Sequence, residues 1–200
     1  MTEQNDCSKD DKQYIVKKVL DGDTIVIARS NSDEAAPKAG EATSISLHEF
    51  PRDCHASLCS ARNDNKKVRL LGIDAFEHDQ NIYGLQGKDF LTMLLLNKNV
   101  CIETDVQKND VYRRTLGYVF VASSKETKQR SARLAMTFIN EELLKNGYAI
   151  LYDFPPNIKY INKLKKAQIY ARQNMLGIWE KQDFIVETPS QWRQKRRSKK

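Results

Sequence analysis

The sequence lacks a long hydrophobic run. No apolar segment of the 200-residue chain approaches the roughly 18 residues that a membrane-spanning helix needs. Residues 1–12 are polar and contain no apolar core of the kind found in secretion signals. We therefore expect no membrane span. The expected location is cytoplasmic by default, or secreted or surface-attached if a signal segment has been removed.

Cysteine is also scarce, with four residues in the chain. Four do not provide the dense disulfide framework that small secreted domains use in place of a core. Cys54 and Cys59, with His55 between them and His48 nearby, have the wrong spacing for the common zinc knuckles. This pattern disfavours a zinc site and leaves a local disulfide, in an oxidising compartment, or free thiols. Cys101, between two apolar residues, is expected to be a small core side chain.

An excess of one charge sign is absent from most of the chain. The sequence holds 33 basic and 26 acidic residues, and six of the basic residues lie in 191–200. The remainder is close to neutral. We expect the basic tail to lie beyond the folded domain and to act as a flexible contact for polyanions, a localisation signal or a solubilising end.

The apolar pattern that is present predicts one domain, residues 14–180, between a polar extension at 1–13 and the basic tail at 181–200. It predicts a hairpin over 14–28, strands over 68–73, 100–106 and 115–121, and helices over 83–97, 133–146 and 157–174. The polar segment of about 29–67 exceeds ordinary hairpin loops and is interpreted as an insertion. About five strands with about three packed helices predict an α+β fold, a five-stranded OB-type Greek-key β-barrel.

Three short segments place carboxylates and arginines beside apolar strands. Charged groups in such places must be paired, bind a metal or take part in chemistry. Hard carboxylate oxygens suit Ca²⁺ or Mg²⁺, and guanidinium groups suit phosphate. The combination therefore predicts a metal-dependent phosphodiesterase. The segments are residues 20–24 with Asp21 and Asp23, residues 68–77 with Arg69, Asp74 and Glu77, and residues 110–116 with Arg114.

The three segments, in this order, resemble the staphylococcal nuclease (thermonuclease) family. The likeness extends from about residue 14 to residue 179 and includes Gly84, Gly147 and the Leu-Gly-Ile-Trp sequence at 176–179. The resemblance implies the OB-type barrel. It also implies a Ca²⁺-dependent nuclease that cleaves DNA and RNA without strong sequence specificity, at the bond to the 5′ oxygen. We expect a monomer.

The resemblance implies a set of metal ligands and a residue that acts on water. Asp23, Asp74 and the backbone carbonyl of Ala75 would bind Ca²⁺ directly, and Asp21 would bind it through water. Glu77 would orient the attacking water or accept its proton. Taken alone, the Asp-Gly-Asp-Thr sequence at 21–24 is more typical of a simple hairpin turn.

The resemblance also implies a set of substrate contacts. Arg69 and Arg114 would hold the scissile phosphate, while Tyr112 and Tyr152 match positions that contact a bound nucleotide. Arg113, where the family usually has glycine, could add a phosphate contact or could misplace its neighbour. The alternatives are a buried salt bridge for Arg69, a surface charge for Arg114 and a core or rim position for Tyr152.

Two other function classes remain open, and one of them, a protein-interaction scaffold, rests only on the length of the 29–67 segment. Barrels of this type often bind single-stranded nucleic acids without catalysis, so a noncatalytic nucleic-acid-binding module is the alternative to an enzyme. Such a module has no need of two aspartates, a glutamate and two arginines together. A further departure from the family is Phe76, where proline is usual, and it removes no catalytic atom.

Overall fold

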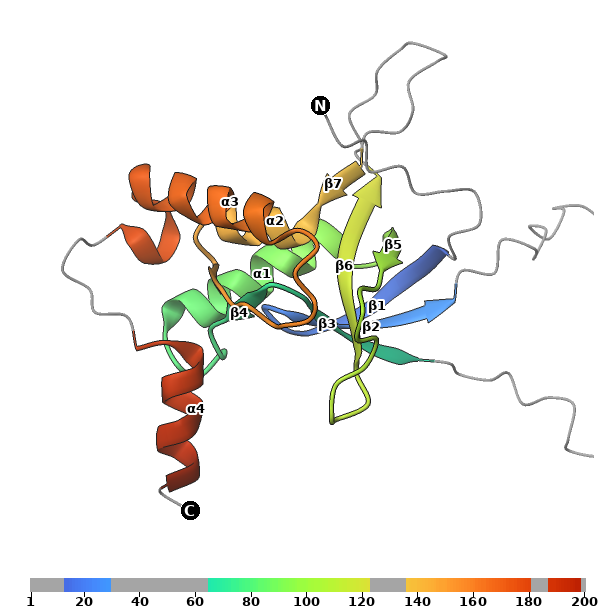
Figure 1. Cartoon of the computed structure of the whole chain (residues 1–200), viewed down its shortest axis with the longest axis horizontal. Helices are drawn as coiled ribbons and strands as arrows, with labels where there is room; N and C mark the ends of the chain where they lie inside the picture. Colours follow the sequence, from blue (N-terminus) through green and yellow to red (C-terminus); the bar gives the residue numbers. More distant parts are fainter. Residues whose placement is uncertain (1–12, 30–64, 123–135, 181–186, 199–200) are drawn as a thin grey trace, which may run out of the picture.

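The computed structural model describes residues 13–29, 65–122, 136–180 and 187–198 (Figure 1). The strands are β1 (Gln13–Asp21), β2 (Thr24–Arg29), β3 (Lys66–Leu70), β4 (Ile73–Ala75), β5 (Asn99–Glu103), β6 (Thr115–Ala122), β7 (Met136–Phe138) and β8 (Ala149–Leu151). The helices are α1 (Ile82–Leu95), α2 (Ile139–Lys145), α3 (Ile161–Gln173), the short 3₁₀ helix η1 (Gly177–Trp179) and α4 (Pro189–Ser198).

Five strands close into a barrel. Antiparallel pairs give the order β3-β2-β1-β5-β6, and β3 then pairs in parallel with β6, which closes the sheet on itself. β7 extends the sheet beyond β6, and β4 pairs with β8 in a separate ribbon. The predicted α+β fold with a five-stranded OB-type barrel is confirmed.

The barrel interior is filled by apolar side chains that alternate along the strands, among them Val16, Ile25, Val68 and Val119. α1 adds Leu91 and Leu95, the stripe that its sequence spacing predicts. α2 and α3 pack together beside the barrel (Figure 1). This packing leaves one rim of the barrel, where β1, β3 and β4 end or begin, to carry the charged residues.

The β1–β2 turn is held against β4. Asp21 faces Thr24 in the register, so Gly22 and Asp23 form a two-residue turn. A side chain at Gly22 would place its Cβ 2.8 Å from the Cβ of Ala75, so only glycine permits this approach. The contact brings Asp23 next to the strand that carries Asp74.

The predicted strand over 68–73 is two strands. Gly72 has a φ of 76°, a left-handed conformation that glycine adopts without strain, and it separates β3 from β4. The chain therefore leaves the barrel after Leu70 and pairs with β8 instead. The break places Arg69 on the barrel and Asp74 on the ribbon, so the two side chains approach from different sheets.

The predicted helix over 133–146 was wrong at its start. Residues 136–138 form β7, and α2 begins only at Ile139. Phe138 lies opposite Phe120 in the β6–β7 register, and the two rings stack with centroids 4.9 Å apart. This cross-strand pair outweighs the helical spacing of the neighbouring apolar residues. The helix ends as predicted before Gly147, which has a φ of 71°.

Other predictions have different outcomes. Cys101 is buried in β5, as predicted. Its sulfur is disulfide-bonded, which the sequence did not predict. Residues 1–12, most of the predicted insertion and its Cys54 and Cys59 lie outside the described residues. Within the described ranges, the helices are all too short or too polar to cross a membrane.

Asn140 joins the barrel to the chain segment between β3 and β4. Its fully buried amide accepts a hydrogen bond from the Val119 N–H at 3.0 Å and donates one to the Leu71 carbonyl at 2.8 Å. Replacing Asn140 with alanine would leave two buried backbone groups without partners. Each such group costs about 1–3 kcal/mol.

We predict that Asn140→Ala lowers the free energy of unfolding by roughly 2–5 kcal/mol, measured by urea denaturation. Asn174→Ala is the control, because Asn174 is exposed and its described side-chain contact is one bond to the Tyr170 carbonyl. The control should change stability by about 0.5 kcal/mol or less. Equal effects of the two substitutions would show that the Asn140 bonds do not hold the segment before β4.

Candidate active site

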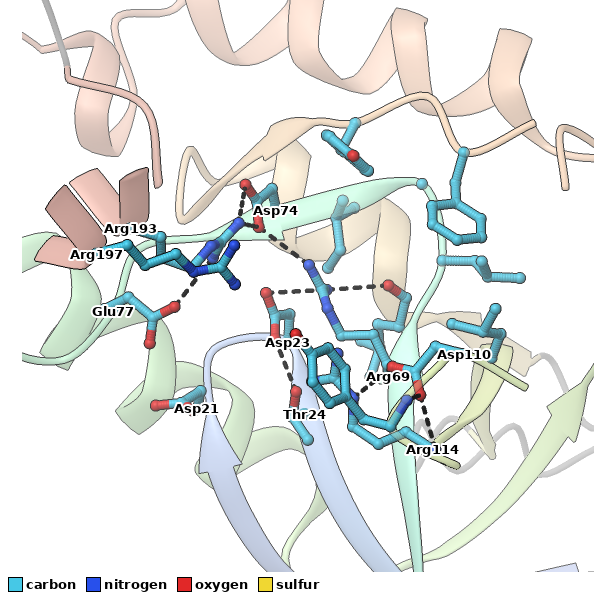
Figure 2. A pocket seen from close by; sticks show the side chains of 18 residues that line it. Asp21, Asp23, Thr24, Arg69, Asp74, Glu77, Asp110, Arg114, Arg193 and Arg197 are labelled. Atoms are coloured by element: carbon cyan, nitrogen blue, oxygen red, sulfur yellow. Dashed lines mark hydrogen bonds and ion pairs between the residues drawn. The ribbon is translucent and has the colours of Figure 1, made fainter. Parts of the chain in front are cut away.

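One cavity of about 500 Å³ opens at the barrel rim. Figure 2 shows charged side chains of both signs pointing into it from the β1–β2 turn, β3, β4, the loop before β6 and α4. The structure thus brings most of the predicted site residues together. Those that line the cavity are Asp21, Asp23, Arg69, Asp74, Glu77, Tyr112, Arg114 and Tyr152.

Arg69 links the two buried aspartates. Its Nη1 lies 2.9 Å from Oδ2 of Asp23, and its Nη2 lies 3.0 Å from Oδ1 of Asp74. Asp74 is 1% exposed and Asp23 is 6% exposed. The salt bridge that was the alternative interpretation of Arg69 is therefore present. It also fixes the guanidinium group at the cavity wall, so pairing and a role in binding are compatible.

Asp23 is fixed by neighbours on both of its oxygens. The Thr24 hydroxyl donates to Oδ1 at 2.9 Å, and the Ala75 N–H donates to Oδ2 at 3.0 Å. Ala75 itself is buried and does not line the cavity, so a metal bond from its carbonyl stays a prediction. Its observed contribution is to hold Asp23 through the backbone.

The buried environment of Asp74 disfavours its negatively charged form. Burial raises the pKa of its carboxyl above the ordinary value, and the positive charges of Arg69 and Arg193 partly oppose that shift. An anion that is removed from water in this way needs cations close by. Asp74 therefore gains strongly from any cation that enters the cavity.

Arg114 is placed by the loop between β5 and β6. Asp110 Oδ1 accepts the N–H groups of Tyr112 and Arg114, each at 2.9 Å, and its Oδ2 accepts Nε of Arg114 at 2.7 Å. The Arg114 guanidinium also lies over the Tyr112 ring, 5.5 Å from its centroid. Arg114 is thus half-buried and paired with Asp110, an anchoring contact that the sequence did not predict.

Arg113 occupies the position at which the staphylococcal nuclease family usually has glycine. Its φ is 60°, a left-handed conformation that costs a non-glycine residue about 1 kcal/mol or more. It points to a neighbouring groove with Lys66 and Lys67 rather than lining the main cavity. Asp110 holds Arg114 in place beside it, and a phosphate contact from Arg113 stays a prediction.

Two arginines that line the cavity were not predicted from the sequence. Arg193 and Arg197 come from α4, in the tail that was expected to lie beyond the domain. The sequence does carry a signal for this helix. Thr188 and Gln191 form a capping box, in which the Thr188 N–H donates to the Gln191 side chain at 2.9 Å, and Pro189 is the first helical residue.

The donor set of the cavity suits a hard cation. Among the described residues, no three His, Cys, Asp or Glu side chains lie close enough to form a metal cluster. The carboxylates of Asp23 and Asp74 meet at Arg69, and they offer only oxygen atoms as ligands. Ca²⁺ and Mg²⁺ accept such sites and complete their coordination with carbonyls and water, so the residues fit these ions.

Comparisons with known proteins show similarity to nucleases. The family described as "Staphylococcal nuclease homologue" matches residues 67–181, more than half of the chain. The Thermonuclease of Staphylococcus intermedius is 29% identical over 175 residues, which cover 85% of this chain and 77% of that protein. The Thermonuclease of Staphylococcus hyicus is 26% identical over 84% of this chain and 76% of its own length. Endonuclease YhcR of Bacillus subtilis is 27% identical over 66% of this chain and 11% of its own length.

The closed five-stranded barrel and the matched family model together define an OB-type barrel protein related to nucleases. Within that class, the chain belongs to the staphylococcal nuclease homologue family.

The anchoring of Arg114 gives a pH-dependent prediction. Desolvation raises the pKa of Asp110, but hydrogen bonds from the Arg114 backbone and side chain and from Tyr112 outweigh it, so the net pKa is below the ordinary value. A lowered pKa stabilises the fold above the unfolded pKa of about 4, and this stabilisation is lost as pH falls through the folded value.

We predict that Asp110→Asn lowers the urea midpoint at pH 7 and that this difference from the unmodified protein shrinks as pH falls from about 4 to 3. Asp89→Asn, at an exposed position in α1, should give a small and nearly constant difference. A difference for Asp110→Asn that is unchanged from pH 7 to pH 3 would contradict the charge-assisted anchoring of Arg114.

Proposed function

We propose that the protein is a Ca²⁺-dependent phosphodiesterase that hydrolyses DNA and RNA without strong sequence specificity. The observation that supports this proposal most is the pairing of Arg69 with both Asp23 and Asp74 at one wall of a cavity that Glu77 and Arg114 also line. A purely structural ion pair has no need of a second arginine and a glutamate across the same cavity.

Asp23 and Asp74 would hold the cation, with Asp21 contacting it through water. Bound there, the cation would supply electrostatic stabilisation of the phosphoryl oxygens and lower the pKa of a nearby water. Asp74 has reason to bind it, because its buried carboxylate lacks solvation. The oxygen-only donor set favours Ca²⁺ or Mg²⁺, and the family resemblance favours Ca²⁺.

Arg69 and Arg114 would stabilise the charge that develops on the phosphate. A guanidinium group donates two parallel hydrogen bonds to phosphate oxygens and stays charged at every working pH. Both groups are already fixed by carboxylates, so little reorganisation is required during the reaction. Lysine offers a point charge without the planar fork and would not replace either residue.

Glu77 would orient the attacking water or accept its proton. It lies two residues beyond β4, is partly buried and lines the cavity on the side of the β1–β2 turn (Figure 2). A carboxylate within reach of a bound water provides general-base assistance of about 10²–10⁴-fold. The assignment needs the Glu77 carboxylate to be free of other partners during the reaction.

Tyr112 and Tyr152 would contact the nucleotide at the cavity entrance. Both side chains line the cavity and are exposed, at 67% and 44% respectively. Exposed rings at the edge of a cavity that contains arginines can stack on any base, so they add affinity without sequence preference. This property matches a nuclease with broad specificity.

We predict that the purified protein degrades plasmid and single-stranded DNA and RNA with Ca²⁺ and loses this activity in chelator. Glu77→Gln should lower kcat by roughly 10²–10⁴. Arg69→Lys and Arg114→Lys should each lower it by at least about 10². Rates are measured at saturating substrate on variants whose circular dichroism matches that of the unmodified protein.

The controls are Glu180→Gln and Arg29→Lys, at exposed positions outside the cavity lining, which should leave kcat unchanged. Binding of nucleic acid without any cleavage would support the noncatalytic module instead. Full activity in chelator, or normal rates in all three cavity variants, would show that the proposed mechanism is mistaken.

A further inference from the structure

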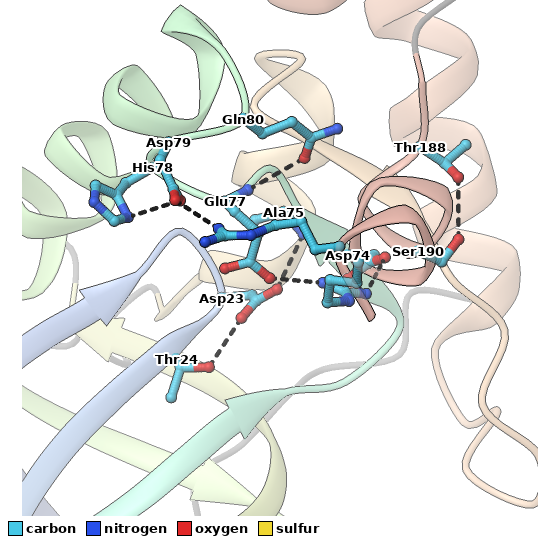
Figure 3. Close-up of polar contacts among 12 residues, drawn as sticks. Asp23, Thr24, Asp74, Ala75, Glu77, His78, Asp79, Gln80, Thr188 and Ser190 are labelled. Carbon is cyan, nitrogen blue, oxygen red and sulfur yellow. Dashed lines mark hydrogen bonds and ion pairs between the residues drawn. The ribbon is translucent and has the colours of Figure 1, made fainter. Parts of the chain in front are cut away.

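α4 lies against the cavity and is held there mainly by charge. Figure 3 shows Asp74 beside the ribbon of α4. The Gln80 side chain donates to the Glu187 carbonyl at 2.8 Å, just before the helix, and Arg196 pairs with Asp79 at 2.7 Å. Arg193, Arg196 and Arg197 are spaced i, i+3, i+4, so they share one helical face. That face meets the acidic segment 74–79.

Arg193 reaches into the site itself. Its Nη2 lies 2.9 Å from Oδ1 and 2.8 Å from Oδ2 of Asp74, and its Nη1 lies 2.9 Å from Oε1 of Glu77. Three charge-assisted hydrogen bonds of this length form a strong contact. They involve both carboxylate oxygens of the proposed metal ligand and one oxygen of the proposed base. The described contacts of the Arg193 guanidinium are thus all to carboxylates that the reaction would need.

The burial of Asp74 explains why the Arg193 guanidinium binds there. Arg69 also donates to Oδ1 of Asp74, so the carboxylate accepts bonds from two arginines. A carboxylate offers about four lone-pair sites, and three bonds from the two arginines take up most of them. The Arg193 guanidinium therefore supplies, from the protein's own chain, the positive charge that the buried carboxylate lacks.

The rest of α4 is weakly attached. Within this helix, which the structure describes in full, Pro189 is the buried residue. The Arg196 and Asp79 side chains are 57% and 45% exposed, so their ion pair contributes little and is screened by salt. A helix held by exposed ion pairs and one inserted arginine can be released locally without unfolding the barrel.

We propose that α4 is an autoinhibitory element in which Arg193 competes with the divalent cation for Asp74 and Glu77. With Arg193 in place, neither carboxylate is available for the reaction. Entry of the cation displaces the guanidinium and releases α4 from the cavity. This inference rests on the proposed function, because it assumes that a divalent cation binds at Asp74.

The rival role for Arg193 is a third phosphate-binding arginine. In that case its removal would weaken substrate binding and leave cation binding unchanged. The two roles therefore predict different results for a measurement of cation affinity made without substrate: competition predicts tighter binding in the variant, and phosphate binding predicts no change.

The test is isothermal titration calorimetry of the full-length protein with Ca²⁺. Arg193→Gln keeps a side chain of similar polarity but removes the competing charge, so its Kd for Ca²⁺ should be roughly tenfold or more lower. Lys195→Gln is the matched control, because it also removes one positive charge from the same helix. The Lys195 side chain pairs with Glu187 and not with the residues of the site. Its Kd should equal that of the unmodified protein.

Hydrogen exchange of the unmodified protein gives a readout that needs no substitution. Saturating Ca²⁺ should increase exchange of the α4 amides, and Arg193→Gln should show the faster exchange without Ca²⁺. An unchanged Kd in Arg193→Gln, with Ca²⁺ binding intact, would overturn the autoinhibitory role alone. Absence of Ca²⁺ binding in both proteins would overturn the metal proposal and the competition together.

Discussion

Two buried carboxylates, Asp23 and Asp74, share one arginine at the rim of the barrel, and the local fold is arranged around this group. Arg69 reaches both aspartates from β3, while Asp23 comes from the β1–β2 turn and Asp74 from β4. None of these charges could be buried alone, because an unpaired ion in such a place costs several kcal/mol. The group therefore requires three segments to meet within hydrogen-bond distance of one another.

The surrounding structure satisfies that requirement through backbone contacts. Gly22 allows the turn to press on β4, the Ala75 N–H binds Asp23, and Gly72 turns the chain out of the barrel between Arg69 and Asp74. Asn140 then fixes the carbonyl of Leu71 at that point. Stability and site geometry thus depend on the same few hydrogen bonds, so substitutions there would affect both properties.

The distribution of charge gives the tail a place in this account. The cavity wall offers carboxylates that are short of positive charge, and the last ten residues carry six basic side chains. Their attraction contributes to the position of α4, whose buried residue is Pro189. It also accounts for the proposed control of the site, because a divalent cation and Arg193 would meet the same electrostatic need.

The sequence predicted the barrel, α1, α3 and most of the charged residues that line the cavity, because apolar spacing and carboxylate–arginine motifs are local properties of the chain. Asp23, Arg69 and Asp74 were recognised as charges that must be paired or used. What local patterns could not show was which partners they find. Arg193 lies 116 positions from Glu77 and 119 positions from Asp74 along the chain. The β7 strand depends on pairing with β6 rather than on the spacing of its own apolar residues. The capping box at Thr188 was readable, but it predicts a helix and not its docking place.

The most direct test of the central claim is a crystal structure of the protein with Ca²⁺ and a nucleoside 3′,5′-bisphosphate. The account predicts Ca²⁺ bound to oxygens of Asp23 and Asp74, a phosphate hydrogen-bonded to Arg69 and Arg114, and Arg193 withdrawn from Asp74. Ca²⁺ bound elsewhere, with the Asp23–Arg69–Asp74 group free of both ligands, would contradict it.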